Sequence, residues 1–450
     1  MQIVIETESI LKGKGFYVTK GKQFQKTTLE TIQWFIFLLA SSVALPIVIG
    51  AMYEMSFMEI SGLMQRTFFV VGIACFIQGL IGHRMPIVDG PAGIWISIFA
   101  IYAITTVEDG GSLGETLRVL ETAMILTGLF LVLIGVFRLS QKSIKLFTPL
   151  VTGSFLFLLT LQLSGTFLQG MFGVEAGSTA KLGNVLISSF VFLFILGFSI
   201  FWKGPLKNYA VIIGIGIGWL LDYFVYGIEK VNIAEQAVKF PEIFAWGMPK
   251  WDAGTIPIAI FTAIILLSNL VASLGAANYV IKGKPSFPYS QMNRGSFTLG
   301  LNQGISAMFS TISVVTLAST SGFIELTGQK KRRPFMLASL LLAIIALFPP
   351  IVSVISMIPA SIANAALLAT FVQLMGIGLR NVASEPFDQR KLTILGVSYL
   401  IGVGLMFMPQ GAFSALPSIV QNVVSNGLLV ATILIIILEQ LWKERKIEKV

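Results

Sequence analysis

The stretch FSTISVVTLASTSGFIELTGQKKRRPF, residues 309–335, decides how the rest of the chain is read. It opens with a run of small polar residues, continues with a short apolar segment at 323–326, and ends in four consecutive basic residues at 330–333. A helix that crosses a bilayer needs about 20 apolar residues, so this segment predicts a half-helix that begins inside the membrane and ends at a cytoplasmic surface. Broken helices are tolerated in lipid where they line a cavity, and in transporters they mark the binding site.

The composition of the whole chain is that of a polytopic membrane protein. Of its 450 residues, 55% are hydrophobic and 12% are charged, whereas a soluble protein carries about 25% charged residues. We therefore assign the net charge of +9 to cytoplasmic loops and expect no nucleic-acid partner. With Cys75 as the single cysteine and His83 as the single histidine, the sequence holds no pair for a disulfide and no thiolate or histidine metal site.

Hydropathy divides the chain into fourteen apolar segments. If both termini are cytoplasmic and the segments alternate, 25 of the 31 basic residues fall on the inner side. Because Lys and Arg are enriched in cytoplasmic loops, we predict fourteen spans in the plasma membrane with both termini inside, and the lysine-rich start without an apolar core predicts no cleaved signal peptide. The segments cover residues 31–51, 67–83, 91–105, 118–137, 147–168, 184–202, 209–227, 255–280, 295–312, 319–328, 334–356, 360–379, 392–408 and 419–440.

Two pairs of segments indicate an inverted repeat with a period of seven segments. Residues 149–163, PLVTGSFLFLLTLQL, and 359–374, PASIANAALLATFVQL, both begin with proline and small residues and reach a Gln near their ends. The third and tenth segments are both short. Because seven is odd, the two halves are inverted, and corresponding short segments in inverted halves point to a transporter binding site.

The third segment opens with MPIVDGPAGIWIS, residues 85–97. We predict that Asp89 caps a helix beginning at Pro91, and that the tenth segment is capped by its serine and threonine residues at 319–321. Two helix N-termini would then face each other near the bilayer centre, each with free N–H groups and partial positive charge. Small residues would let a flat ligand rich in carbonyl oxygens, or an anion, approach the backbone there: Ala92, Gly93, Ser321 and Gly322.

Residues 319–328, STSGFIELTG, resemble the signature of the nucleobase–ascorbate transporter family, the nucleobase–cation symporters of xanthine/uracil permease type. Gly322, Thr327 and Gly328 match the signature, whereas Ser319 stands where the family has Gln or Glu and Thr320 where it has Asn. The first, fifth and twelfth segments also resemble those of the family, so the resemblance extends over essentially the whole chain.

The resemblance implies a core domain formed by segments 1–4 and 8–11 and a gate domain formed by the others, with short strands where segments 3 and 10 cross. It implies uptake of a purine, a pyrimidine or a related nucleobase by alternating access, coupled to a proton or Na⁺ and without a resident cofactor, and a homodimer formed through the gate domain. The boundaries are a cytoplasmic tail at 1–30, the core domain at 31–140 and 254–357, the gate domain at 141–253 and 358–441, and a cytoplasmic tail at 442–450.

The predicted substrate site departs from the family pattern in the eighth segment. Family members place there a Glu that binds two ring N–H groups, but residues 259–280 contain no acid. The Glu position falls on Asn269 or Ala272, and we favour Asn269 because an amide offers both a donor and an acceptor. The alternative for Asn269 is a hydrogen bond between helices. The predicted substrate-binding set is Asn269, Ser273, Ser319, Thr320, Ser321, Gly322, Ala92, Gly93 and Gln33.

Acids within membrane segments are candidates for ion coupling. Asp89 and Glu325 are the two we single out, although Asp89 could serve as the helix cap and Glu325 could pair with the basic cluster at 330–333. Glu121 follows Arg118 by three residues, and we interpret the two as a pair on the outer surface.

Two other functional classes are open at this point. An anion transporter of the related sulfate-carrier fold would present the same two helix N-termini to an inorganic anion. An intramembrane enzyme is disfavoured because the sequence lacks an H-E-x-x-H motif and a paired-acid motif.

Overall fold

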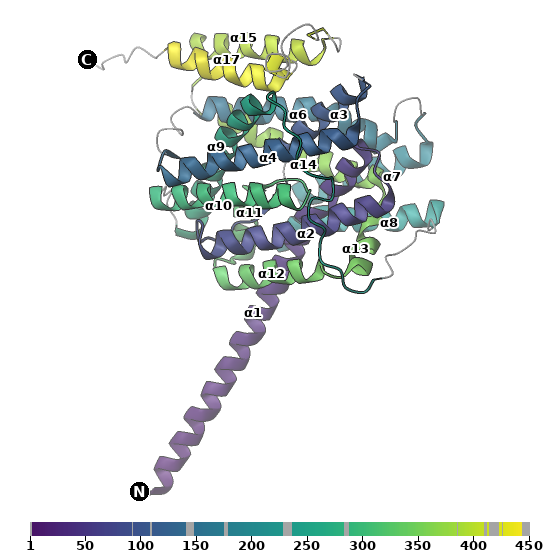
Figure 1. Ribbon diagram of the computed structural model, residues 1–450. Helices are drawn as coiled ribbons and strands as arrows, with labels where there is room; N and C mark the ends of the chain where they lie inside the picture. The colour runs from purple at the N-terminus through teal and green to yellow at the C-terminus, as the bar shows by residue number, and fades with distance from the viewer. Residues whose placement is uncertain are drawn as a thin grey trace, which may run out of the picture.

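The computed structural model describes the backbone of residues 2–442 except 92, 109, 141–147, 175–178, 228–235, 283–287, 385, 409–411, 414–422 and 425, and the side chains from residue 25 onward except at 104, 108, 205, 208 and 326. Within these ranges the protein is a bundle of helices around one two-stranded ribbon (Figure 1). The expected all-α membrane architecture with short strands is therefore confirmed.

Every one of the fourteen predicted segments overlaps a helix, and the eleventh overlaps two. Among the described residues, seven helices are long and apolar enough to cross a membrane, or eight if α12 and α13, which bend by 92°, form one span. The helices are α1 (Gln2–Met52), α2 (Phe57–Leu80), α3 (Gly93–Glu108), α4 (Leu113–Val136), α6 (Pro149–Phe172), α7 (Leu182–Phe201), η1 (Pro205–Tyr209), α8 (Ala210–Tyr226), α9 (Thr255–Lys282), α10 (Tyr289–Met308), α11 (Ser319–Thr327), α12 (Arg332–Ile345), α13 (Pro349–Ser356), α14 (Ala360–Val382), α15 (Gln389–Met406) and α17 (Gly427–Leu441).

Local sequence signals explain where several helices begin and end. Ser56 and Glu59 form a capping box at the start of α2, in which each side chain satisfies a backbone N–H of the other. Thr148 caps α6, Pro149 occupies its first turn, and Gly173 ends it in the left-handed conformation with φ of 66°. The residue types at these helix ends are therefore those that favour capping and termination.

Glycines bring the most closely packed helices together. On α4 and α10, a Cβ added to Gly128 would lie 2.6 Å from the carbonyl oxygen of Gly300. On α6 and α14, a Cβ added to Gly153 would likewise lie 2.6 Å from the carbonyl oxygen of Gly378. Small residues allow such backbone contact between membrane helices, where dispersion forces drive association.

The helix contacts follow a regular scheme. α2 packs on α12 and α4 on α10, while α1 packs on α12 and α4 on α9. The pairs α7–α8 and α15–α17 are also in contact, and Figure 1 shows α15 and α17 together at one end of the molecule. When each helix is replaced by the helix seven segments away, these contacts are exchanged for one another. The α2–α12 contact then corresponds to α10–α4, α1–α12 to α9–α4, and α7–α8 to α15–α17.

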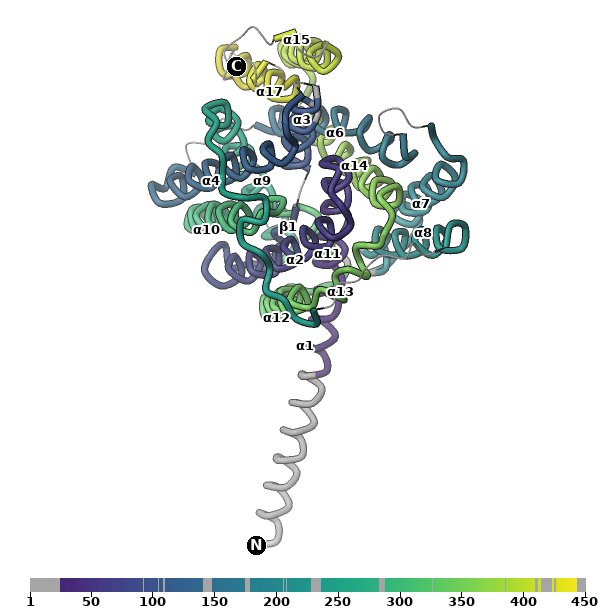
Figure 2. The backbone as a smooth tube through the Cα atoms, turned by 45° about the vertical axis from the view of Figure 1, so that its right-hand side comes forward, coloured from purple at the N-terminus to yellow at the C-terminus, as the bar shows by residue number. Residues whose placement is uncertain are grey.

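The two short half-helices leave from opposite ends of the ribbon. Strand β1 (Asp89–Pro91) pairs antiparallel with β2 (Val314–Thr316), with Asp89 opposite Thr316 and Pro91 opposite Val314. α3 therefore starts beyond the Pro91 end and α11 beyond the Thr316 end, two residue pairs or roughly 7 Å apart along the ribbon. Figure 2 shows β1 in the middle of the bundle, among α10, α2 and α11.

Two predicted details of these helix starts are wrong. Pro91 ends strand β1, and the helix begins at Gly93. The residue that precedes α11 is Ala318, which carries no capping side chain and is already helical, with φ of −63° and ψ of −27°. A side-chain cap needs extended backbone, and the residue before α11 has none because the chain turns directly out of the ribbon.

Candidate functional site

Asp89 is the first residue of strand β1, at the end of the ribbon from which α11 leaves, and it is fully buried. Its Oδ2 accepts a hydrogen bond of 3.1 Å from Nδ2 of Asn302 on α10. Its backbone N–H and carbonyl both lie 3.2 Å from Sγ of Cys75 on α2. The prediction that Asp89 caps the following helix is therefore wrong, because its carboxylate faces α10, across the ribbon. A carboxylate buried within a membrane protein is costly, which makes Asp89 a candidate functional residue.

Asn269 and Ser273 on α9 hold the other strand. The Asn269 Nδ2 donates to the Thr316 carbonyl at 2.6 Å, and the Ser273 hydroxyl donates to the same oxygen at 3.3 Å. The amide nitrogen of Asn269 therefore forms the structural hydrogen bond between elements that was the alternative role for this residue. Asn269 is half-buried, and no described residue donates to its Oδ1, which is left to accept a hydrogen bond from a ligand.

The polar residues at the start of α11 have three different environments. The buried Thr320 hydroxyl accepts from the Val88 N–H at 3.2 Å. The Ser321 hydroxyl donates back to the Ala318 carbonyl at 2.7 Å. Ser319 is exposed. Only Ser319 of the three therefore presents a hydroxyl outward, while Thr320 and Ser321 stabilise the turn from ribbon to helix.

The glycines at the two helix starts also differ. A Cβ on Gly322 of α11 would meet no atom within 4 Å. A Cβ on Gly93 of α3 would lie 2.6 Å from Cζ of Phe371 on α14, and that ring packs edge-on against Phe167 of α6 with centroids 4.9 Å apart. The α3 start is therefore covered, whereas the α11 start is open. Ala92, the remaining residue of the predicted set at α3, lies outside the described residues.

Gln33 and Glu325 do not join this group. The Gln33 Oε1 accepts from Nε2 of Gln329, which lies just beyond the far end of α11. The nine residues of α11 rise about 1.5 Å each, so this end is roughly 12 Å from Ser319. Glu325 is exposed. The one ion pair within the described ranges joins Lys250 to Glu115 at 2.6 Å, so Glu325 has no ion-pair partner there. The predicted pairing of Glu325 with the basic cluster at 330–333 is therefore not formed.

Two adjacent amides on α10 were missed by the sequence analysis. Asn302 binds Asp89 as described above, and Gln303 donates from Nε2 to the Val314 carbonyl at 2.7 Å. The Oε1 of Gln303 accepts from Nε1 of Trp95 on α3 at 3.0 Å. Adjacent amides inside an apolar segment are the signal that could have identified them, because side-chain amides in membrane helices bond to neighbouring elements.

Glu121 is a second residue that the structure places differently. The predicted surface pair with Arg118 is wrong, because Glu121 is fully buried and Arg118 Nε donates to the Met248 carbonyl instead. The Ser310 hydroxyl donates to Glu121 Oε1 at 2.5 Å, and the Ser310 carbonyl accepts from Nε of the buried Arg66 at 3.0 Å. The helical spacing of Glu121 from Leu117 and Met124, which are also buried, was the available signal.

The site as a whole is a ribbon held by amides, hydroxyls and one buried carboxylate. It presents an exposed helix start on α11, with the half-buried Asn269 side chain bonded to the strand that leads into it. Such a surface offers hydrogen bonds to a polar planar solute and partial positive charge to an electron-rich atom. Among the described residues there is no group of three or more His, Cys, Asp or Glu side chains that could hold a metal ion.

Solved structures share this fold. The chain is similar to the transmembrane domain of the cyanobacterial bicarbonate transporter BicA, with a TM-score of 0.60 and 12% identity over 91% of this chain and 97% of that one. It is also similar to the murine anion transporter Slc26a9 in its inward-facing state, with a TM-score of 0.52 and 12% identity over 88% of this chain and 67% of that one. At this level of identity the likeness establishes the fold alone.

Sequence relatives are more specific. The chain is 30% identical over 434 residues to the "Putative purine permease YwdJ" of Bacillus subtilis, covering 94% of this chain and 97% of that protein. It is 25% identical over 444 residues to the xanthine permease of Bacillus subtilis, covering 95% and 97%. Residues 25–411 match the permease family of xanthine and uracil permeases. The chain therefore belongs to the xanthine/uracil permease family and is a multi-pass membrane permease and not an enzyme.

Proposed function

We propose that this permease takes up a purine-type nucleobase by alternating access, with the solute bound between the open start of α11 and Asn269 of α9. The observation that carries the proposal is the first turn of α11, where Ser319 is exposed and a Cβ on Gly322 would meet no atom within 4 Å, directly after the strand that Asn269 holds. The relatives named above as purine and xanthine permeases favour a purine. A further relative, 25% identical over 438 residues, is named as a uric acid permease, and uric acid is also a purine.

The chemistry of the site suits a ring with carbonyl oxygens and N–H groups. The N–H groups of Ala318 and Ser319 have no acceptor within the described part of the chain, so they and the Ser319 hydroxyl can donate to ring carbonyls. The Oδ1 of Asn269 can accept from a ring N–H. Gly322 leaves room for the flat face of the base. No ionised side chain is needed for these contacts, which agrees with the absence of an acid from the eighth segment.

The membrane arrangement that we propose has fourteen spans, both termini in the cytoplasm, and the core and gate domains as bounded above. The correspondence between fourteen predicted segments and the helices supports the span count. The placement of 25 of the 31 basic residues on the inner side supports the orientation. The helix contacts that repeat at an offset of seven segments support the inverted repeat. Cysteine-accessibility labelling in intact cells, with single cysteines placed at residues 27 and 442, tests the orientation: both positions should label only after permeabilisation.

We further propose that uptake is coupled to a proton or to Na⁺ through Asp89. The full burial of its carboxylate and its bond to Asn302 at the crossing of two half-helices support this role. Uptake into vesicles with an imposed proton or Na⁺ gradient identifies the ion, and Asp89→Asn should abolish the response to the gradient. A gradient response that persists in Asp89→Asn would assign coupling to another group, of which the exposed Glu325 is the first to test. A homodimer through the gate domain is a separate proposal, tested by cross-linking in the membrane.

Competition of substrate uptake tests the proposed function. Radiolabelled xanthine is supplied to cells that lack their own purine permeases and express this chain, with hypoxanthine, guanine, uric acid, uracil, sulfate or bicarbonate as competitors. We expect purines to compete and the inorganic anions to have no effect. Competition by sulfate or bicarbonate, without competition by any base, would favour the anion-transporter alternative, whose fold this chain shares.

A further inference from the structure

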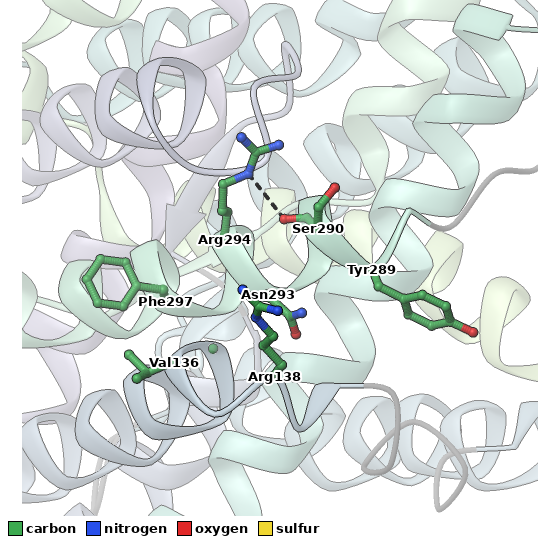
Figure 3. Close-up of a pocket in the computed structure, with 8 residues that line it drawn as sticks. Val136, Arg138, Tyr289, Ser290, Asn293, Arg294 and Phe297 are labelled. Atoms are coloured by element: carbon green, nitrogen blue, oxygen red, sulfur yellow. Dashed lines mark hydrogen bonds between the residues drawn. The ribbon is translucent and has the colours of Figure 1, made fainter.

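One hollow on the described surface lies away from the ribbon, between the C-terminal end of α4 and the N-terminal end of α10. It measures about 880 Å³, within the 300–1,000 Å³ that is usual for small-molecule sites. Figure 3 shows its lining: Gly135, Val136, Arg138, Tyr289, Ser290, Asn293, Arg294 and Phe297. We refer to it as the α4–α10 hollow.

A close contact between the backbones of α4 and α10 borders the hollow. A Cβ on Gly135 would lie 2.7 Å from the Asn293 carbonyl oxygen and 2.7 Å from the Phe297 backbone nitrogen. The two helix backbones therefore touch at Gly135, and this contact borders the hollow. Apolar side chains line part of the opening, because Val136 and Phe297 border it and Val136 is exposed.

Two guanidinium groups stand at the rim of the hollow. Arg138 and Arg294 are both exposed. Neither has an ion-pair partner within the described ranges, in which the one ion pair joins Lys250 to Glu115. Nε of Arg294 donates to the Ser290 carbonyl at 3.2 Å, which fixes the direction of that side chain. The remaining N–H donors of both groups are available to an anion.

Arg138, which lines the hollow, has a strained backbone conformation. Its φ is 57°, in the left-handed region, directly after the end of α4. Glycine is the usual residue at this position of a helix end, because other residues pay a steric cost there. Arg138 and Asn293 both line the hollow (Figure 3). The Oδ1 of Asn293 is buried and has no partner among the described residues, so it can accept a hydrogen bond from a ligand hydroxyl.

We propose that the α4–α10 hollow binds an anionic glycerophospholipid of the phosphatidylglycerol class. The phosphate lies at Arg138 with Arg294 at the opposite rim, a headgroup hydroxyl donates to Asn293 Oδ1, and an acyl chain lies along Val136 and Phe297. Charge selects this occupant, because the amine of a zwitterionic headgroup would be brought toward two guanidinium groups. A free phosphate shares the anionic contact but lacks the apolar part.

Titration of the purified full-length chain tests this proposal. Phosphatidylglycerol, phosphatidylcholine with the same acyl chains, or inorganic phosphate is added in detergent, and the thermal unfolding midpoint is followed. We expect phosphatidylglycerol to raise the midpoint and the other two to leave it unchanged. An equal effect of phosphatidylcholine or of inorganic phosphate would overturn the proposal, the first by showing a nonselective acyl groove and the second by showing a simple anion site.

Three variants connect the effect to the hollow. In Arg138→Gln and Arg294→Gln we expect the half-saturating phosphatidylglycerol concentration to rise by roughly five-fold each, the effect of one basic side chain at an anionic lipid surface. The matched control is Arg380→Gln, which removes an exposed arginine in the last turn of α14 that does not line the hollow; its titration should equal that of the wild type.

A fourth variant separates lipid binding from folding. Arg138→Gly removes the guanidinium and also relieves the backbone strain, since glycine adopts positive φ without a steric cost. We expect a higher unfolding midpoint without lipid, together with the same weakened phosphatidylglycerol titration as Arg138→Gln. Wild-type titrations in both Arg138 variants would place the lipid elsewhere.

Discussion

The two half-helices leave the same ribbon, yet their first turns meet different surroundings. At α3, the Phe371 ring occupies the space that a Cβ on Gly93 would need. At α11, Ser319 is exposed and a Cβ on Gly322 would meet nothing within 4 Å. The helix dipole gives both N-termini the same partial charge, so the difference is steric. A side chain from α14 covers the start of α3, and the start of α11 therefore remains the accessible one.

The largest effect is expected from removing the aromatic cover. Phe371 is buried against Phe167 and Gly93, so Phe371→Ala should lower the free energy of unfolding by about 3–5 kcal/mol, the usual cost of this truncation in a core. Denaturant unfolding of the purified chain measures the loss. Phe407→Ala is the control, because Phe407 is 84% exposed. Equal losses in the two variants would mean that Phe371 does not cover α3.

Filling the open start should affect transport and not stability. Gly322→Leu places a side chain where no atom lies within 4 Å, so the free energy of unfolding should change little. A base displaced from α11 loses at least two hydrogen bonds of about 0.5–1.5 kcal/mol each, and we expect xanthine affinity to fall by roughly 10- to 100-fold. The measurement is the concentration dependence of uptake.

The matched control for this variant is Gly216→Leu. Gly216 is an exposed glycine on α8 that also has nothing within 4 Å of its missing Cβ. Uptake by this control should equal that of the wild type. If Gly216→Leu and Gly322→Leu impair uptake equally, the open space at α11 is not the binding site.

The contact between Gly93 and Phe371 can be isolated by a double-mutant cycle. Gly93→Ala would bring a methyl group within 2.6 Å of the Phe371 ring, and such overpacking costs about 1–3 kcal/mol. In the Phe371→Ala background the same substitution should cost almost nothing, since the ring is gone. The cycle measured by unfolding should therefore give a coupling energy of about 1–3 kcal/mol. Additive effects would show that the two residues are not in contact.

The smallest effect is expected from a single hydroxyl. Ser319→Ala removes an exposed group with no structural bond in the described part of the chain, so stability should remain within about 0.5 kcal/mol of wild type. One lost hydrogen bond of about 0.5–1.5 kcal/mol should weaken xanthine binding by roughly 2- to 10-fold. Ser321→Ala is the comparison, because that hydroxyl donates to the Ala318 carbonyl. A greater loss of uptake in Ser321→Ala than in Ser319→Ala would reverse the proposed assignment.

Much of the fold was predictable because long apolar runs and turn residues act locally. The fourteen predicted segments overlap the helices, and the Pro-Gly break after Val88 coincides with the ribbon. The helix starts were predicted less well. Capping propensity assigned Asp89 and Ser319–Ser321 to helix ends, but strand pairing, which links residues more than 200 positions apart, took precedence over that local preference.

The candidate site was predictable in part for the same reason. Asp89 and the start of α11 could be singled out as polar groups at breaks in apolar segments, and Asn269 by its match to the acid position of the family that the chain resembles. Asn302 and Gln303 were hidden within a segment read as a span, although they hold Asp89 and Val314. Glu121 was assigned to a neighbour three residues away, because its true partner, Ser310, is 189 positions distant.

The sequence by itself determined that this chain is a helical membrane protein with two short, broken segments, since hydropathy, charge asymmetry and proline and glycine breaks are local properties. The resemblance of residues 319–328 to a family signature indicated a permease. The tertiary structure alone decided which groups meet at the ribbon and which helix start is open. Those outcomes depend on side chains supplied by distant elements, as Phe371 of α14 covers Gly93 of α3 and leaves Gly322 of α11 uncovered. Packing between elements, which no local pattern encodes, therefore selects which helix start is accessible.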